Sequence, residues 1–174
     1  MIENAAIKAI LARRSIRRYE NKPVEREKID AILACAAAAP SANNFRPWHF
    51  IEVTDRKTLN ALSDAHPYGK MLDESPLAVV VCAATEKFKT PDVWWEQDCG
   101  AAIQNILVAA TALGLGSVWL GVHHSPNGLP DKIRAILGIP PHIQVAAIVA
   151  VGYGAETKPP YEAPDPALTH QGRW

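Results

Sequence analysis

Four segments of the chain carry apolar residues every three or four positions, which is the spacing that places side chains on one face of a helix. This spacing predicts helices over residues 4–12, 25–39, 56–65 and 131–137. The residues at two of their ends agree, because Asp55 can cap the start of the third helix and Gly138 can close the last one. Four helices of ordinary length are therefore expected.

Four shorter runs are apolar without helical spacing and are bounded by turn residues. They predict strands over residues 49–53, 77–84, 117–121 and 144–151. The second and fourth of these runs, LAVVVCAA and QVAAIVAV, have no charged residue, which is typical of strands covered on both faces. Helices and strands thus alternate along the chain.

A longer helix is predicted over residues 97–113, apolar on nearly every side and followed by Gly114, a residue favoured just after helix ends. The stretch over residues 101–122 is long enough to cross a bilayer. Gln104 and Asn105 interrupt it, however, and no cluster of Lys or Arg flanks it. We therefore expect a helix surrounded by protein or at a contact between two subunits, and no membrane association.

The length of 174 residues suits one self-sufficient hydrophobic core, so residues 1–174 are expected to form a single domain. The last part of the chain, residues 152–174, contains four prolines and neither helical nor alternating periodicity. This pattern predicts an extended arm or a disordered tail. Three isolated cysteines without CxxC spacing fit neither a disulfide scaffold nor a zinc ribbon, and favour a reducing cytoplasm.

The charges cancel: 18 Lys and Arg residues balance 18 Asp and Glu residues. A protein without net positive charge has no general field for nucleic acid or anionic membranes, so neither is expected as a partner. The distribution is uneven, because residues 1–28 contain eight basic and four acidic side chains. Any anion that this protein binds must therefore be bound locally.

The densest group of charges is the segment ARRSIRRY over residues 12–19, with four arginines and one serine within six positions and no acid among them. Guanidinium groups and a hydroxyl are donors that grip phosphate oxygens. A phosphate site is one interpretation, and a solvated basic face is the other.

A second polar group lies in the loop APSANNFRPWHF over residues 39–50. Pro40 ends the preceding helix, and Ser41 and Asn44 bring short hydrogen-bonding side chains to a segment rich in turn residues. Such a loop can present polar groups to the edge of a planar ligand, although an ordinary helix-to-strand turn has the same composition.

Taken in order, three motifs resemble those of the nitroreductase-like flavoprotein family: RRSIR (residues 13–17), APSANNFRPW (residues 39–48) and GLGSVWLGV (residues 114–122). The resemblance extends over nearly the whole chain. It implies an α+β fold in which a mixed central β-sheet packs with helices, with the long apolar helix at a dimer interface and the arm over residues 152–174 lying on the partner subunit.

The resemblance also implies an FMN-binding, cytoplasmic homodimer with flavin sites shared between subunits. Hydride would pass from NADH or NADPH through flavin N5 to a small electron-poor acceptor such as a nitroaromatic or quinone, with no protein group required as a catalytic residue. The family pattern assigns phosphate, ribityl and pyrimidine contacts near the N-terminus, a loop from the partner subunit, and a backbone segment along the flavin that donates a hydrogen bond at N5. These roles fall on Arg13, Arg14, Ser15 and Arg17, on Pro40, Ser41 and Asn44, and on Leu120, Gly121 and Val122.

Some residues depart from the family pattern. Arg46 replaces a common glutamine, and Lys158 is the one nearby candidate for a second basic residue at the phosphate. Lys70 either approaches the flavin or is a solvated lysine, and the Trp94-Trp95 pair either walls the substrate space or packs. The remaining pair in question is His123 and His124, which we expect not to bind metal, because neighbours on a strand point apart and no further ligand stands at useful spacing.

Three other functions remain open from the sequence. The chain could be a non-catalytic module that binds a flavin or another phosphorylated ligand. It could belong to a family branch with other flavin chemistry, such as reductive dehalogenation or flavin fragmentation. It could also be a purely structural dimer whose basic cluster pairs with acids elsewhere.

Overall fold

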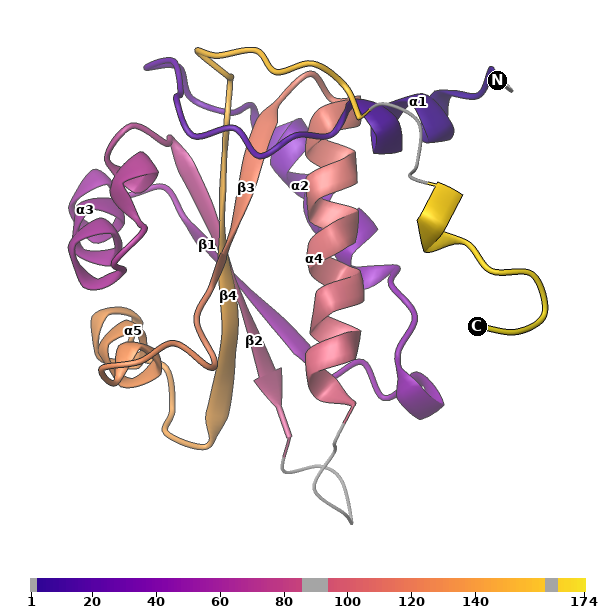
Figure 1. Ribbon diagram of the computed structural model, residues 1–174. Helices are drawn as coiled ribbons and strands as arrows, with labels where there is room; N and C mark the ends of the chain where they lie inside the picture. Colours follow the sequence, from indigo (N-terminus) through magenta and orange to yellow (C-terminus); the bar gives the residue numbers. More distant parts are fainter. Residues whose placement is uncertain (1–2, 86–93, 162–165) are drawn as a thin grey trace.

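The computed structural model describes residues 3–85, 94–161 and 166–174, and shows a β-sheet with helices on both faces (Figure 1). The strands are β1 (Trp48–Val53), β2 (Leu77–Ala84), β3 (Gly116–Gly121) and β4 (Ile143–Gly152). The helices are α1 (Ala5–Ala12), α2 (Arg26–Ala37), α3 (Arg56–Ala65), α4 (Trp95–Ala112) and α5 (Leu129–Leu137), with short 3₁₀ turns at Ala42–Asn44, Lys70–Asp73 and Pro166–Leu168. Each predicted helix and strand is present, with its ends within two residues of the prediction.

The sheet has the strand order β1-β2-β4-β3, and each neighbouring pair of these strands is antiparallel. The prediction of a mixed sheet is therefore wrong for the strands that the structure describes. A helix between two strands often returns the chain to give parallel neighbours. Here residues 66–76 return the chain after α3 to the end of the sheet where β1 stops. β2 therefore starts there and runs opposite to β1, and Ala78 pairs with Val53.

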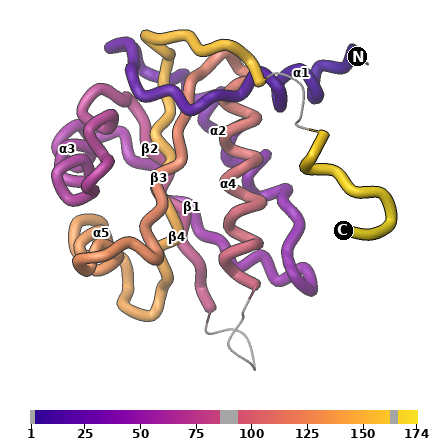
Figure 2. The backbone as a smooth tube through the Cα atoms, viewed as in Figure 1, coloured from indigo at the N-terminus to yellow at the C-terminus, as the bar shows by residue number. Residues whose placement is uncertain are grey.

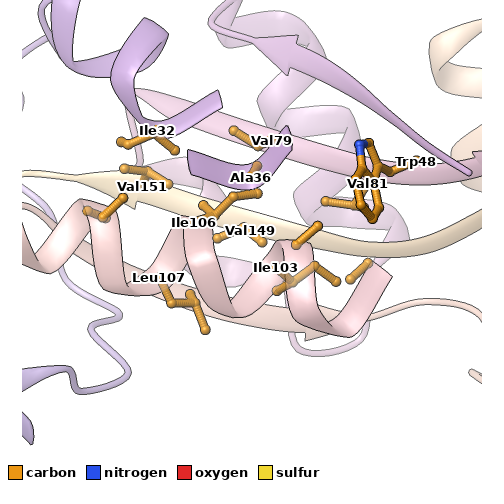
Figure 3. Close-up of a cluster of buried hydrophobic side chains, with 14 of the residues drawn as sticks. Ile32, Ala36, Trp48, Val79, Val81, Ile103, Ile106, Leu107, Val149 and Val151 are labelled. Atoms are coloured by element: carbon orange, nitrogen blue, oxygen red, sulfur yellow. The ribbon is translucent and has the colours of Figure 1, made fainter. Parts of the chain in front are cut away.

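The central strands are buried on both faces, which explains their lack of polar positions. Side chains of β2 alternate between two hydrophobic clusters: Val79 and Val81 face α2 and α4, whereas Val80 faces α3 and α5. Figure 3 shows the first cluster, in which Ile32 from α2 and Ile106 from α4 meet the sheet. The structure thus has three layers, with α2 and α4 on one face and α3 and α5 on the other (Figure 1).

The long helix α4 differs from the prediction in one respect. Its inner side is buried against the sheet and α2, but Glu96, Gln97 and Gln104 are exposed, so the chain by itself does not surround α4. Asn105 is half-buried and donates a hydrogen bond to the carbonyl of Cys35, at 2.8 Å. In the described part of the chain, no helix combines the length and the apolar character needed to cross a membrane.

Two irregular segments cross the same end of the sheet and lie against each other (Figure 2). The first follows α1, and its Ser15 forms an isolated parallel bridge with Ser117 of β3. The second follows β4, and its Gly154 pairs antiparallel with Tyr19. Part of the predicted arm, residues 162–165, lies outside the described residues; up to residue 161 the arm packs on its own chain, where the Tyr161 amide donates to the Leu11 carbonyl at 3.0 Å.

The predicted helix ends are confirmed. Asp55 caps α3 by accepting the amide proton of Thr58 at 2.8 Å. Gly114 after α4 and Gly138 after α5 have φ values of +75° and +64°, a backbone region that glycine enters without steric cost.

Candidate functional site

A basic cavity of about 510 Å³ opens where α1 ends, beside the second irregular segment. We call it the basic cavity, and its lining contains no acidic residue among those that the structure describes. It gathers five of the predicted site residues: Arg13, Arg14, Ser15, Arg17 and Lys158. The other lining residues are Ile10 and Leu11 of α1, Gln104 of α4, and Tyr161 of the second irregular segment. The structure therefore brings together residues 143 positions apart (Ser15 and Lys158), as a shared phosphate site requires.

Lys158 is held in the basic cavity by two contacts. Its Nζ donates to the carbonyl of Ser15 at 2.6 Å and lies 3.4 Å from Oε1 of Glu156. The same carboxylate accepts the backbone N–H of Arg17. This backbone hydrogen bond, followed by the charge of Lys158, holds the pKa of Glu156 below its ordinary value. Glu156 thus fixes the cavity's Lys158 and the backbone of Arg17 together.

The four arginines of the ARRSIRRY segment are used differently. Arg18 turns away and its Nε pairs with Oε2 of Glu74 at 3.2 Å. Arg14 donates to the carbonyl of Pro159. Within the described part of the chain, no carboxylate pairs with the guanidinium of Arg13 or Arg17. Two arginines of the basic cavity therefore keep their donors available for an anion.

A second cavity of about 400 Å³ lies between the start of α4 and the end of β3. We call it the aromatic cavity because Trp95 and Trp119 both line it. Its other lining residues are Glu96, Ile103, Gly121, Val122, His123, His124, Ser125, Pro126 and Ala146. Ile103 lines the aromatic cavity and the next residue of α4, Gln104, lines the basic one, so both cavities border the same turn of this helix.

The predicted backbone segment at the end of β3, residues 120–122, divides between core and cavity. Leu120 is buried in the hydrophobic cluster beneath α3 and α5, whereas Gly121 and Val122 line the aromatic cavity. The carbonyl of Gly121 accepts from Ser125 Oγ at 3.0 Å and contacts Nε2 of His66 at 2.9 Å. The amide of Val122 already donates to the carbonyl of Ala146 at 3.0 Å. A hydrogen bond from this segment to a flavin stays a prediction.

The loop after α2 contributes no predicted site residue to either cavity. In the part of the chain that the structure describes, Pro40, Ser41 and Asn44 line neither of them. The loop is nevertheless well defined, because Ser41 Oγ accepts the amide proton of Arg46 at 2.9 Å and the Arg46 Nε donates to Asn44 Oδ1 at 2.9 Å. Asn44 and Arg46 have φ values of +56° and +51°, which is strained for residues other than glycine.

A buried carboxylate anchors this loop to α4. Asp98 is 5% exposed, and its Oδ1 accepts the amide proton of Ala42 at 2.9 Å. No motif in the sequence links Asp98 to this loop, because the contact joins the first turns of α4 to a residue 56 positions earlier.

Three residues whose roles were left open have defined surroundings. Lys70 is a surface residue: its Nζ lies 3.1 Å from Asp64 Oδ1, and this hydrogen bond raises its pKa. Trp95 is buried and forms a wall of the aromatic cavity. Trp94 is half exposed.

The reasoning that separated His123 from His124 is wrong. β3 ends at Gly121, so the two histidines follow the strand, and their rings meet edge to face with centroids 4.5 Å apart. Both face Glu96, with Nε2–Oε distances of 3.7 Å for His123 and 3.0 Å for His124. Burial, followed by the charge of His124, lowers the pKa of His123. No spacing in the sequence reveals this cluster, because Glu96 and the histidines are joined only by the packing of α4 against β3.

Comparison with known proteins identifies the family and the fold. A family model described as the Nitroreductase family matches residues 10–66 and 63–153. A protein of Archaeoglobus fulgidus, named "Putative NADH dehydrogenase/NAD(P)H nitroreductase", is 45% identical over 171 residues, covering 97% of this chain and 98% of that protein. An FMN-dependent nitroreductase from Clostridium difficile R20291 has a structure that superposes with a TM-score of 0.90 at 36% identity, covering 97% of this chain and 99% of that one.

A third structure comes from Desulfovibrio desulfuricans and is described as "a putative nitroreductase in complex with fmn". It superposes with a TM-score of 0.83 at 29% identity, covering 99% of each chain. An α+β fold with this sheet and these helices, together with a match over most of the chain, defines the class of protein. The chain belongs to the nitroreductase family.

Proposed function

We propose that this chain is an FMN-dependent oxidoreductase that transfers hydride from NADH or NADPH through flavin N5 to an electron-poor acceptor such as a nitroaromatic or a quinone. The observation that carries the proposal is the basic cavity, in which Arg13 and Arg17 have no carboxylate partner among the described residues. Unpaired guanidinium groups beside Ser15 and Lys158 are what a phosphomonoester needs. The names of the relatives from Clostridium difficile and Desulfovibrio desulfuricans support FMN as that ligand.

The two cavities fit the two ends of such a ligand. The basic cavity offers cationic and hydroxyl donors for the phosphate, and the aromatic cavity offers Trp119 and the backbone at Gly121 for a planar ring. Their volumes, about 510 and 400 Å³, are in the usual range for ligand sites. When bound, FMN would supply the hydride chemistry that no side chain of this protein can perform.

The chain's own residues would bind FMN and orient it toward the acceptor. Arg13 and Arg17 would neutralise the phosphate, and Lys158 would add a third positive charge from the other irregular segment. Trp95 and Trp119 would limit the space open to the acceptor and exclude water from one side of the ring. No residue is assigned as a proton donor or nucleophile.

We further propose that the protein acts as a homodimer in which Pro40, Ser41 and Asn44 complete the site of the partner subunit. The ordered loop that carries them lines neither cavity of its own chain. Large apolar side chains are also exposed on α1 and β3, including Ile10 at 52% and Trp119 at 43%. A contact between two chains would cover such surfaces.

The test is the visible spectrum of the protein as purified, followed by titration with FMN and anaerobic titration with NADH and NADPH. Arg17→Ala removes one charged donor and should weaken FMN binding roughly tenfold to a hundredfold. Arg18→Ala is the matched control, because it removes the neighbouring arginine that pairs with Glu74 outside the cavity.

Wild-type protein that neither binds FMN nor shows FMN-dependent oxidation of a nicotinamide would refute the proposal. Flavin binding without reduction by either nicotinamide would favour a non-catalytic flavin module. An equal loss of affinity in Arg17→Ala and Arg18→Ala would show that the basic cavity is not the phosphate site.

A further inference from the structure

Three metal-ligating side chains converge at the mouth of the aromatic cavity. One nitrogen of His123, one nitrogen of His124 and one carboxylate oxygen of Glu96 all lie within 4.8 Å of one another. The histidines come from the turn after β3 and the glutamate from the first turn of α4, so two separate parts of the chain contribute. The proposed flavin chemistry uses none of these three groups.

The distances suit a small divalent ion. In a tetrahedral site with metal–ligand bonds of about 2.0–2.1 Å, neighbouring ligand atoms stand about 3.3 Å apart. The two histidines approach different oxygens of the Glu96 carboxylate, at 3.0 Å from His124 Nε2 to Oε2 and 3.7 Å from His123 Nε2 to Oε1, and both distances are close to this value. Two ligand atoms 4.8 Å apart, the upper limit in this cluster, would have to approach each other by about 1.5 Å to reach the tetrahedral spacing. The side chain of His124 is 78% exposed and can make that movement.

The surroundings favour this arrangement over a single hydrogen-bonded pair. The ring of Trp95 stands edge-on to His123, with centroids 4.6 Å apart and an interplanar angle of 89°, and so orients the imidazole. Glu96 lies in the first turn of α4, where the helix dipole interacts favourably with a negative charge.

We propose that Glu96, His123 and His124 bind a divalent transition-metal ion, with two imidazole nitrogens and one carboxylate as ligands and a fourth position open to solvent or to the aromatic cavity. Imidazole with one carboxylate selects borderline ions such as Zn²⁺, Co²⁺ and Ni²⁺ over Mg²⁺ or Ca²⁺. Three protein ligands with an open position are the arrangement of zinc sites that exchange a water. The three ligands line the aromatic cavity and not the basic one, and no atom of FMN is needed to complete this ligand set.

The experiment is isothermal titration of tag-free protein, as purified, with Zn²⁺, repeated with Mg²⁺ as the comparison ion. His124→Ala removes an exposed ligand, and Glu96→Gln keeps the size of the side chain while removing its charge. His170→Ala is the matched control, since it deletes another exposed imidazole far along the chain. Thermal unfolding of each variant without metal verifies that it is folded.

We expect one Zn²⁺ per chain, and a loss of affinity in both ligand variants greater than the roughly tenfold that loss of an outer-shell partner costs. His170→Ala should bind as the wild type does. With Co²⁺, the wild type should show the visible absorption of tetrahedral cobalt, and His124→Ala should not.

Three results would each overturn the proposal: no Zn²⁺ binding by the wild type, a smaller than tenfold loss in either ligand variant, or an equal loss in His170→Ala. None of these results depends on flavin content. Failure of the metal site therefore leaves the FMN proposal standing, and failure of FMN binding leaves the metal site to be judged on its own titration.

Discussion

Gly116 is the position where a single methyl group should disturb both the fold and the basic cavity. A Cβ placed there would lie 2.8 Å from Cγ2 and 2.9 Å from Cβ of Ile16, closer than real Cβ contacts come. Ile16 cannot move aside easily, because it is β-branched and its amide is bonded to the carbonyl of Ser117 at 3.0 Å. Gly116→Ala should therefore push the whole segment away from β3.

The expected cost follows from the contact and its neighbours. Overpacking of this kind typically costs about 1–3 kcal/mol of unfolding free energy. Ile16 stands between Ser15, which binds Lys158, and Arg17, which binds Glu156 through its backbone. Displacing the segment should weaken FMN binding by roughly tenfold, equivalent to about 1.4 kcal/mol.

Urea unfolding measures the first effect and FMN titration the second. Gly121→Ala is the control for the unfolding measurement, because it lies at the other end of β3, has no heavy atom within 4 Å of the added Cβ, and should change stability by less than about 0.5 kcal/mol. Combining Gly116→Ala with Ile16→Ala removes the clashing methyl and should cost less than the sum of the two single changes. Wild-type stability in Gly116→Ala alone would refute the reasoning.

Three further outcomes are expected. Asp98→Ala should destabilise the protein by about 1.5–3 kcal/mol, the range for a hydrogen bond to a charged group, because the amide of Ala42 loses its acceptor; chemical unfolding beside Asp98→Asn measures this. Glu156 has a lowered pKa in the folded protein, so its contribution to stability is full above the ordinary carboxylate pKa and is lost as pH falls through the lowered value. The difference in unfolding free energy between wild type and Glu156→Gln should therefore shrink on acidification. A difference that does not change with pH would contradict this. Ile106→Ala should cost about 2–5 kcal/mol by thermal or urea unfolding, since the side chain is fully buried between α4 and the sheet.

Local signals were sufficient to locate the helices and strands. The apolar run of β2 and the cap at Asp55 are properties of consecutive residues, and the structure places both where the pattern predicts. Strand direction was not predictable in this way. The direction of β2 depends on how residues 66–76 return the chain after α3, and this segment carries no sequence pattern that shows at which end of the sheet β2 begins.

The part of the candidate site formed by consecutive residues was predictable from the sequence. The part formed by residues that only the packing of the fold brings together was not. The segment containing Arg13 and Arg17 was found because its charges are adjacent in sequence. Glu156 was missed, because it joins the cavity through a backbone hydrogen bond to a residue 139 positions away. Gln104 was noted only as a polar interruption of an apolar helix, although that interruption marks where α4 faces the basic cavity.

The alternation of an extended chain explains why Arg17 and Arg18 have different roles. Ser15 bridges to Ser117 along the edge of β3, so this segment is locally extended, and side chains two positions apart point to the same side. Arg17 shares the cavity side with Ser15, whereas Ile16 packs against Gly116 and Arg18 reaches Glu74. A net charge of zero is therefore compatible with an anion site, because Arg17 lines the cavity while its neighbour Arg18 pairs with Glu74 at the surface.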